Sequence, residues 1–463
     1  DSVGPRLHIE GLAYYLGLNY VPGAHTLFSD IQQLMPGHQL ELSSSGKIQI
    51  SKYWDFSYEE TTDLGEKHYV ERFDELMRQT VSQHLVSDVP HGLLLSGGLD
   101  SSSLAYYMSQ VEEMEVESFS IDFQEDSYGE SKYASKVAKH LSCNHHSTMV
   151  ESNAIELLPK LVWHSEEPTA DSSMLAYYHL CESARKKITV AIGGDGADEI
   201  LAGYETYSAW KAHQMYRCLP SWLTSTVLKP MLNQFSVSDK KMSKRFKLRR
   251  FLNTSEMTSE EAHASWRVIF DEEARSKLLQ PLSQHDGIHS DFRTLFIDSF
   301  NNSPATDPVN RMLYVDSKVY LPSDMLTKVD RMSMAHSLEV RVPFLDHELV
   351  DFVNTVPSKY KLKYWLKKKH LLKQAMRGRL TNDIIYRKKA GFNLPVNQWL
   401  RSGMKEFVCD HLSESTIKTM GIFDSDYVAS LLQNHFDKKS DNSFEIWGLL
   451  VCSIWFSTFN PRV

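Results

Sequence analysis

Strands and helices alternate between about residue 65 and residue 194, and this alternation limits the fold more than any other feature of the sequence. Helical spacing of apolar residues in "HYVERFDELMRQTVSQHLV" precedes the short apolar run "HGLLL". The same succession continues through the expected strands "VESFSIDF", "HHSTMV" and "ITVAIGG". Such alternation requires crossover connections, which make the strands parallel and put helices on both faces. The sequence therefore predicts an α/β fold with a doubly wound parallel sheet.

The two ends of the chain read differently from this central stretch. Residues 1 to about 60 read as short extended pieces with turns, and the alternation in "HQLEL" and "KIQIS" predicts a hairpin. From about Tyr204 onward the pattern is largely helical. The longest apolar run, "FEIWGLLVCSIWFSTF", is shorter than the ~20 residues that a bilayer requires. A buried helix is expected there, and no membrane span.

The charge balance and the cysteines narrow the classes of partner. The 463 residues carry a formal net charge of −9, which gives no general attraction to nucleic acid or to an anionic membrane. Five scattered cysteines without a C-x-x-C pair predict neither a disulfide framework nor a zinc site, and are typical of a reducing cytoplasm. The basic run "KKMSKRFKLRR" (240–250) is interpreted as a solvated helix face, with a contact to a polyanion or partner as the alternative.

The stretch "SGGLDSSS", from Ser96 to Ser103, follows the expected strand "HGLLL". Parallel sheets bind ligands beyond the carboxyl ends of their strands. Two glycines allow close backbone approach, and the helix that follows offers unpaired N–H groups with partial positive charge. These features, with the serine hydroxyls, predict a cradle for phosphate oxygens. A tight turn in which the acid caps the next helix is the alternative.

Asp100 in the middle of this stretch predicts a bound cation. Each carboxylate–phosphate charge pair at ~4 Å would cost about 4 kcal/mol at an effective dielectric near 20, so a magnesium ion is expected between them. A second strand exit, "VAIGGDGADEILAGYETY", repeats the pattern of glycines and acids. Asp198 in that exit is the natural partner of Asp100. Acids gathered at a helix N-terminus for reasons of the helix dipole are the alternative.

The stretches around these two strand exits resemble those of a known family. "SDVPHGLLLSGGLDSS" is similar to the pyrophosphatase loop of the asparagine synthetases, and the similarity continues in order along the chain. It includes "SFSIDFQEDSYGESKYASKVAKHLSCNHH", "LVWHSEEPTADSS", "VAIGGDGADEILAGY", "YLPSDMLTKVDRMSMAHSLEVRVPFLDHELV" and "RKKAGFNLPVNQWL". The resemblance implies a sheet of the pyrophosphatase-loop (adenine nucleotide α-hydrolase-like) type with a largely helical C-terminal part.

The resemblance also implies the reaction and its cofactors. ATP and Mg²⁺ would serve ATP-dependent amide formation, in which the aspartate side chain attacks the α-phosphate to give β-aspartyl-AMP and pyrophosphate. Ammonia would then displace AMP and give asparagine. In the family's terms, pyrophosphate is held by Ser96, Gly97, Gly98, Asp100, Ser101 and Ser102, the nucleotide site is lined by Leu95, Ile121, Gly193 and Gly194, and magnesium is bound by Asp100 and Asp198.

Two further residues take catalytic roles from the resemblance. Lys389 in "YRKKAGF" falls where the family has a catalytic lysine, and Lys388 is the alternative. A cation there would stabilise the charge that gathers on phosphorus and on the departing pyrophosphate. Asp195 stands where family members carry Asp or Glu, which is suited to taking a proton from ammonia or to ordering the substrate amine.

The chain departs from the family in two respects. The usual "SGDGGDELFGGY" is "GGDGADEILAGY" here, so Gly193 lacks a hydroxyl and Ala197 and Ala202 replace glycines. Small residues remain throughout, so the loop is still expected to close on ATP, while nucleotide affinity and substrate fit stay open. The chain also begins at Asp1, not at the catalytic cysteine of a glutaminase domain. Residues 1–60 are therefore expected to be a junction segment at the end of a glutaminase domain, and 61–463 the synthetase domain. Free ammonia is the expected nitrogen source, with the glutaminase domain upstream or in trans.

Several alternatives stay open. Enzymes that close β-lactam rings, cyclise lasso peptides or amidate sugars use the same adenylation, and the activation loop does not separate them. A nucleotide-binding regulatory protein without catalysis is another reading, against which the retention of Asp100, Asp198 and Lys389 argues. Enzymes of the superfamily that modify tRNA need a basic RNA surface, which this chain lacks. The sequence leaves a homodimer open.

Overall fold

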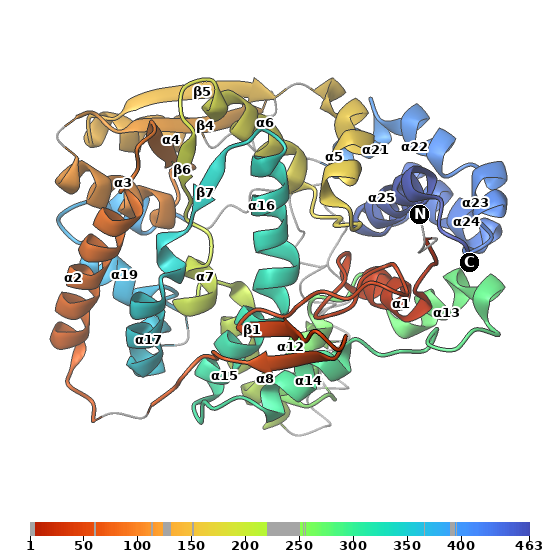
Figure 1. Cartoon of the computed structure of the whole chain (residues 1–463), viewed down its shortest axis with the longest axis horizontal. Coiled ribbons are helices and arrows are strands. Elements are labelled where there is room, and N and C mark those ends of the chain that lie inside the picture. The colour runs from red at the N-terminus through yellow and green to blue at the C-terminus, as the bar shows by residue number, and fades with distance from the viewer. Residues whose placement is uncertain are drawn as a thin grey trace.

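A parallel sheet of five strands forms the upper left of the structure, in the strand order β5-β4-β3-β6-β7 (Figure 1). The structure is a computed structural model. It describes residues 5–59, 62–112, 114–123, 131–150, 152–219, 251–252, 254, 256–364, 366–388, 394 and 396–463. The strands are β3 (His91–Leu94), β4 (Glu117–Phe123), β5 (Asn144–Val150), β6 (Val190–Ile192) and β7 (Glu339–Arg341). The four strands expected from the sequence are confirmed, and β7 joins them from far along the chain.

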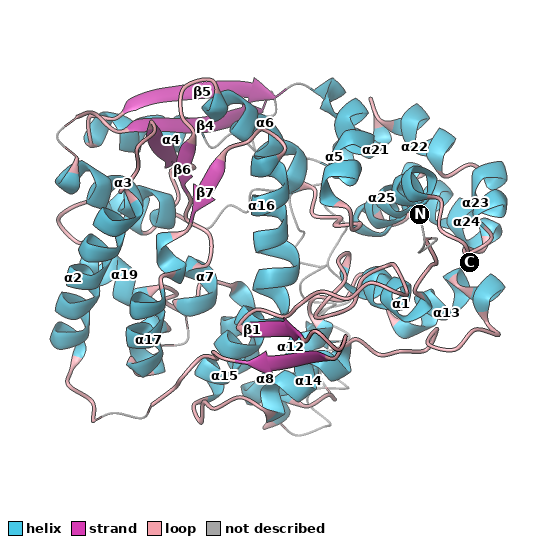
Figure 2. Ribbon diagram, in the orientation of Figure 1, coloured by secondary structure: helices cyan, strands magenta, loops and turns pink. Residues whose placement is uncertain are grey.

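Helices cover both faces of the sheet, as the sequence predicts (Figure 2). Neighbouring residues of β3 point to opposite faces, and Leu93 and Leu94 accordingly lie in two separate hydrophobic clusters. The cluster around Leu93 includes buried residues of α2 (Glu66–His84), α3 (Leu99–Val111), α4 (Ser131–His140), α17 (His347–Thr355), α19 (His370–Ala375) and α20 (Asn382–Ile385). The cluster around Leu94 includes α5 (Leu158–Ser165), α6 (Ser173–Arg185) and α16 (Thr327–Met334).

The remaining helices form the lower and right-hand parts of the molecule (Figure 1). A third cluster joins α8 (Glu205–Arg217), α12 (Ser259–Ser265), α14 (Arg293–Asn301) and α15 (Pro308–Val315). The C-terminal helices are α21 (Val396–Arg401), α22 (Lys405–His411), α23 (Glu414–Met420), α24 (Ser425–Phe436) and α25 (Ser443–Phe459). Short elements complete the set: α7 (Ala197–Ile200), α13 (Glu272–Leu278), α18 (Ser358–Lys361), the 3₁₀ turns at Ser152–Leu157, Gln280–Leu282 and Pro343–Leu345, and the π-helix Asp316–Leu326.

The apolar run near the C-terminus folds as α25, and its residues from Ile446 to Trp455 are buried. Among the described helices, none combines the length and the apolar character needed to cross a bilayer. The expectation of a buried helix is confirmed. The basic run 240–250 lies outside the described residues.

The expectation of extended structure over residues 1–60 is partly wrong. The hairpin forms as predicted, from β1 (His38–Leu42) and β2 (Ile48–Lys52) with Leu40 opposite Ile50. Residues Ile9–Leu18, however, form the helix α1, whose residues from Gly11 to Leu18 are all buried. Its apolar residues lie all round the helix, so the sequence shows no amphipathic stripe. Tertiary packing fixes it, including a hydrogen bond from the Tyr15 hydroxyl to the Gly448 carbonyl (2.7 Å).

Lys361 is a completely buried lysine at the end of α18. Its ammonium donates a hydrogen bond to Oδ1 of Asn310 on α15 (2.9 Å). Burial lowers the pKa of Lys361 to about 7, and the attraction of Asp307 offsets this only in part. Folding therefore favours loss of a proton that the unfolded chain retains.

We expect the free energy of unfolding of the wild-type protein to rise, relative to that of Lys361→Met, as the pH increases from about 7 to about 10. In this window the folded protein has lost the Lys361 proton, whereas the unfolded chain still binds it, so higher pH favours the folded state. Below the window both states are protonated and the difference between the two proteins is constant. Urea unfolding at a series of pH values measures this difference.

The matched control for this experiment is Lys67→Met, because the Lys67 side chain is 88% exposed. The control should follow the wild-type pH dependence throughout. If the free energies of unfolding of the wild type and Lys361→Met change in parallel from neutral to alkaline pH, Lys361 does not titrate in this way.

Candidate functional site

The two glycine-rich stretches lie side by side because β3 and β6 are neighbours in the sheet. Gly92 pairs with Ala191 and Leu93 with Ile192, in parallel register. Both strands therefore end at the same edge, where α3 begins at Leu99 and α7 begins at Ala197. The carboxyl edge of a parallel sheet is where α/β proteins bind their ligands.

The turn after β3 is held by its own hydroxyl groups. The Ser96 backbone N–H donates to Oγ of Ser101 (3.2 Å), and the two serine hydroxyls are 3.0 Å apart. The Gly98 N–H donates to Oγ of Ser96 (3.2 Å). Gly97 has a φ of +68°, and a side chain there would lie 2.4 Å from the backbone N of Ala134 on α4. The turn therefore requires glycine at this position.

The two turns touch each other. A side chain at Gly194 would lie 3.3 Å from the backbone N of Ser101 and 3.4 Å from Cβ of Asp100. The segment that leads toward Lys389 also reaches this place, because the Arg387 guanidinium donates to the Ser96 carbonyl (3.4 Å). Three segments distant in sequence thus converge at one edge of the sheet.

Asp100 and Asp198 converge on a single cation, the ammonium of Lys369. Its Nζ lies 2.5 Å from Oδ2 of Asp100 and 2.7 Å from Oδ1 of Asp198. The Lys369 side chain is only 8% exposed. Burial would lower the pKa of Lys369, but the attraction of the two carboxylates outweighs it and raises the pKa above its usual range. The ammonium therefore stays charged and offsets part of the negative charge that the two acids bring together.

The backbone is shaped around this contact. Lys369 precedes α19 with a left-handed φ of 52°. A side chain at Gly203 would lie 1.8 Å from Oδ1 of Asp198 and 2.2 Å from Cε of Lys369. Ala202 also has a left-handed φ of 56°, a conformation that costs a residue with Cβ roughly 1–2 kcal/mol. Sequence reasoning missed Lys369, because the run "LKKKH" reads as an ordinary charged surface.

Asp195 is influenced both by the acids of the two turns and by a second buried lysine, Lys328. Burial raises the pKa of Asp195, Lys328 lowers it, and the charges of Asp198 and Asp100 raise it further. The Lys328 ammonium is 3.0 Å from Oδ2 of Asp171, and its side chain is 5% exposed. A carboxyl group with a raised pKa beside two acids is suited to accept a proton. Lys328 is a second residue that the sequence reasoning did not single out, although it lies within a quoted motif.

A further carboxyl group in this region belongs to the π-helix Asp316–Leu326. Asp324 is buried, and burial together with the nearby Asp171 carboxylate raises its pKa to about 7, against the opposing charge of Lys328. π-Helical turns are rare and occur frequently at functional sites. The sheet edge thus carries an unusual density of buried acids and lysines.

The other predicted site residues are distributed as follows. Leu95 is buried and donates its N–H to the Phe119 carbonyl (2.7 Å). Ile121 is buried within β4, and the Ser102 side chain is completely buried. Gly193 donates its N–H to the Arg341 carbonyl of β7 (2.8 Å). Lys389 lies outside the described residues, so its predicted role stays a prediction.

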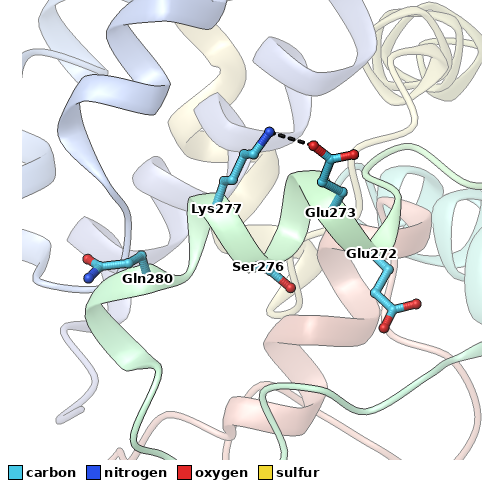
Figure 3. Close-up of a pocket in the computed structure, with 5 residues that line it drawn as sticks. All are labelled: Glu272, Glu273, Ser276, Lys277 and Gln280. Atoms are coloured by element: carbon cyan, nitrogen blue, oxygen red, sulfur yellow. Dashed lines mark hydrogen bonds and ion pairs between the residues drawn. The ribbon is translucent and has the colours of Figure 1, made fainter.

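A separate hollow of about 680 Å³ lies over α13 (Figure 3). The described residues that line it are Glu272, Glu273, Ser276, Lys277 and Gln280, and no predicted site residue is among them. Lys277 and Glu273 form an ion pair across one helical turn (2.6 Å). The described residues that line the hollow come from α13 and from Gln280 just after it. They do not bring together groups from different elements.

A parallel sheet with acidic, glycine-rich turns at adjacent strand ends defines the class of α/β enzymes that bind ligands beyond the carboxyl edge. The family model described as asparagine synthase matches residues 72–457. A Bacillus subtilis protein named asparagine synthetase [glutamine-hydrolyzing] 1 is 31% identical over 97% of this chain and 68% of its own length. The chain therefore belongs to the asparagine synthase family, and it is a carbon–nitrogen ligase.

Two other relatives are similar along most of the chain and carry different names. A putative asparagine synthetase of Mycobacterium tuberculosis is 26% identical over 97% of this chain and 67% of its own length. A Penicillium rubens protein named amidase chyE is 25% identical over 90% of this chain and 66% of its own length. The chain thus spans about two thirds of the length of these relatives.

Proposed function

We propose that this chain forms asparagine from aspartate, ATP and ammonia. The observation that carries the proposal is the convergence of Asp100 and Asp198, from adjacent turns, on one cation position. Aspartate would be activated as β-aspartyl-AMP with release of pyrophosphate, and ammonia would then displace AMP. Family membership supports ATP-dependent amide formation in general, and the names of the relatives support asparagine as the product.

The two acids fit a magnesium ion in their chemistry. Both are carboxylates, which Mg²⁺ prefers, and the Lys369 ammonium between them serves as a stand-in for a bound cation. Asp100 and Asp198 would hold the ion. When bound, Mg²⁺ would neutralise charge on the polyphosphate.

The chain's own groups have separate tasks in this proposal. The turn at Ser96, Gly97 and Gly98 and the first turn of α3 would direct N–H groups and hydroxyls at pyrophosphate oxygens. Lys389 would stabilise the charge that develops on phosphorus and on the leaving group. Asp195, with its raised pKa, would accept a proton from ammonia as the new carbon–nitrogen bond forms.

The proposal is tested by incubating the chain with ATP, magnesium, ammonium and a panel of amino acids. Pyrophosphate release and the mass of each product are measured. Release that depends on aspartate, with asparagine as the product, is expected. Release that requires a different carboxylate would favour one of the related amide-forming enzymes, and binding of ATP without any release would favour a regulatory nucleotide-binding protein.

The source of the ammonia can be tested separately from the synthetase reaction. We propose that ammonia for this chain comes from a glutaminase domain joined to residues 1–60 or acting in trans. The same assay with glutamine in place of ammonium tests this, first with the chain alone and then with the glutaminase domain of a relative added. Activity with glutamine and the chain alone would contradict the proposal.

Lys369→Met should strengthen the binding of a divalent cation in the absence of nucleotide. Without the ammonium, Asp100 and Asp198 would repel each other, and at ~4 Å this repulsion is about 4 kcal/mol for an effective dielectric near 20. We expect Mn²⁺, measured by electron paramagnetic resonance, to bind at least about tenfold more tightly than to the wild type.

The control is Lys367→Met, two residues away and exposed, which should bind Mn²⁺ as the wild type does. Triple replacement of Lys369 by Met and of both acids by Asn should remove the gain. Equal Mn²⁺ affinity in the wild type and Lys369→Met would show that these acids do not form a cation site.

A further inference from the structure

Two histidines and a glutamate meet at the amino-terminal end of α1, on elements other than the two strand exits. His8 precedes the helix, Glu10 lies in its first turn, and His25 lies in the segment that follows it. One ligand atom from each of the three lies within 4.8 Å of the others, and each side chain is half-buried. Two imidazoles with one carboxylate are a ligand set of zinc and other first-row transition metals.

His8 is oriented as a metal ligand would be. Its Nδ1 lies 2.9 Å from the Thr26 carbonyl oxygen, which can only accept a hydrogen bond, so Nδ1 carries the proton. In the neutral ring Nε2 then presents its lone pair, and Nε2 lies 3.9 Å from Oε2 of Glu10. Histidines that bind metals characteristically donate their other ring N–H to a carbonyl or carboxylate in this manner.

The carboxylate and the second imidazole are positioned by the same neighbours. The buried Tyr14 hydroxyl donates to Oε1 of Glu10 (2.7 Å), which leaves Oε2 to face His8. The His25 ring stacks on His8 with centroids 5.6 Å apart and meets the edge of Tyr14 at 5.1 Å.

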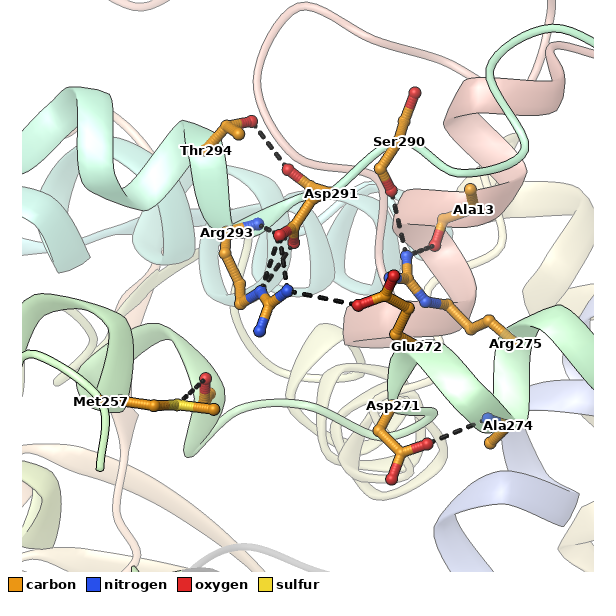
Figure 4. Close-up of polar contacts among 11 residues, drawn as sticks. Ala13, Met257, Asp271, Glu272, Ala274, Arg275, Ser290, Asp291, Arg293 and Thr294 are labelled. Carbon is orange, nitrogen blue, oxygen red and sulfur yellow. Dashed lines mark hydrogen bonds and ion pairs between the residues drawn. The ribbon is translucent and has the colours of Figure 1, made fainter. Parts of the chain in front are cut away.

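The backbone leaves room for these contacts. A side chain at Gly11 would lie 2.6 Å from the Thr26 carbonyl oxygen and 3.1 Å from Nδ1 of His8, so a larger residue would break their hydrogen bond. Farther along α1, the buried Arg275 donates to the carbonyl of Ala13 (3.1 Å), which holds the helix in place (Figure 4). The cluster is therefore built on a fixed element.

We propose that His8, Glu10 and His25 bind one first-row transition metal ion, with Zn²⁺ as the expected ion and a fourth position open to water. Bonds of about 2.0–2.2 Å to nitrogen and oxygen would require the three ligand atoms to draw closer than they now lie. The bound ion would tie the start of α1 to the segment around His25. The site is independent of amide formation, because it shares no residue with the proposed ATP site.

The test measures Zn²⁺ binding by equilibrium dialysis, and Co²⁺ binding by its d–d absorption, on the full chain without nucleotide. We expect one ion per chain, with a Co²⁺ spectrum typical of four coordination. His25→Asn and Glu10→Gln should each weaken Zn²⁺ binding at least tenfold, and Tyr14→Phe, which removes only the group that orients Glu10, about tenfold. Zn²⁺ should also raise the melting temperature of the wild type.

The control variants are His140→Asn and Glu41→Gln, both at exposed positions, which should bind Zn²⁺ as the wild type does. Circular dichroism of each variant without metal checks that it is folded, and the rate of pyrophosphate release should be the same in all of them. Absence of a bound ion in the folded wild type, or binding that survives both His25→Asn and Glu10→Gln, would overturn the proposal while leaving the proposed synthetase reaction untouched.

Discussion

Asp100→Asn should abolish asparagine formation while leaving the protein folded. The substitution removes the carboxylate that would hold magnesium against the polyphosphate, and the loss of one such preorganised group lowers turnover at least about a hundredfold. The fold should tolerate the change, because Lys369 retains its contact with Asp198 (2.7 Å) and no buried charge is left alone. Pyrophosphate release and the melting temperature are measured on the same preparation.

The control is Asp88→Asn, which makes the same chemical change at an exposed position shortly before β3. This variant should retain wild-type turnover. Asp198→Asn should behave as Asp100→Asn does, because the two acids share one cation position. Turnover of Asp100→Asn within a few-fold of the wild type would rule out the proposed role of the strand exits.

Asp316→Asn should destabilise the protein strongly. The Asp316 carboxylate is completely buried and accepts a hydrogen bond from the Tyr207 hydroxyl (2.7 Å). It also lies 2.6 Å from the Arg267 guanidinium and 2.9 Å from His263. Burial would raise the pKa of Asp316, but Arg267 and His263 outweigh it and hold the pKa well below the usual range. The acid is therefore charged in the folded state and balances a buried cation.

The expected loss is about 3–5 kcal/mol, because the amide would leave the Arg267 charge buried without its counter-ion. The melting temperature should fall by roughly 3–5 °C, because the entropy of unfolding of a chain this long is about 1 kcal/mol per degree. Asp330→Asn, at a position whose side chain is 64% exposed, is the control and should change neither quantity. Combining Asp316→Asn with Arg267→Gln should recover part of the lost stability. If the double variant lost as much free energy of unfolding as the two single variants added together, the ion pair would be contradicted.

The sheet and the two strand exits could be predicted from the sequence because their signals are local. A strand covered on both faces is a short apolar run, as in "HGLLL" and "ESFSIDF", and the turns beyond it need glycine for close approach. The meeting of Asp100 with Asp198 followed from a rule of topology, since parallel strands end at a common edge. Both features can be recognised without knowledge of the rest of the chain.

The cations of the site could not be predicted in this way. Lys369 is separated from Asp100 by 269 residues, and a lysine that will be buried looks the same in sequence as one in solvent. The same holds for Lys328 and its partner Asp171. Helix α1 was missed for a related reason, because its stabilisation comes from α25 at the other end of the chain. In each case the residue is visible in the sequence, but the distant residue that it contacts in the fold is not.

The ammonium of Lys369 gives the folded chain a counter-ion of its own. Acids gathered for binding a metal usually repel one another when the metal is absent, and a protein that depended on the metal to relieve this would lose its structure in a magnesium-poor cell. Here a covalently attached charge holds the place. If Asp100 and Asp198 hold the proposed magnesium ion, scarcity of the ion should stop the proposed reaction and leave the fold intact.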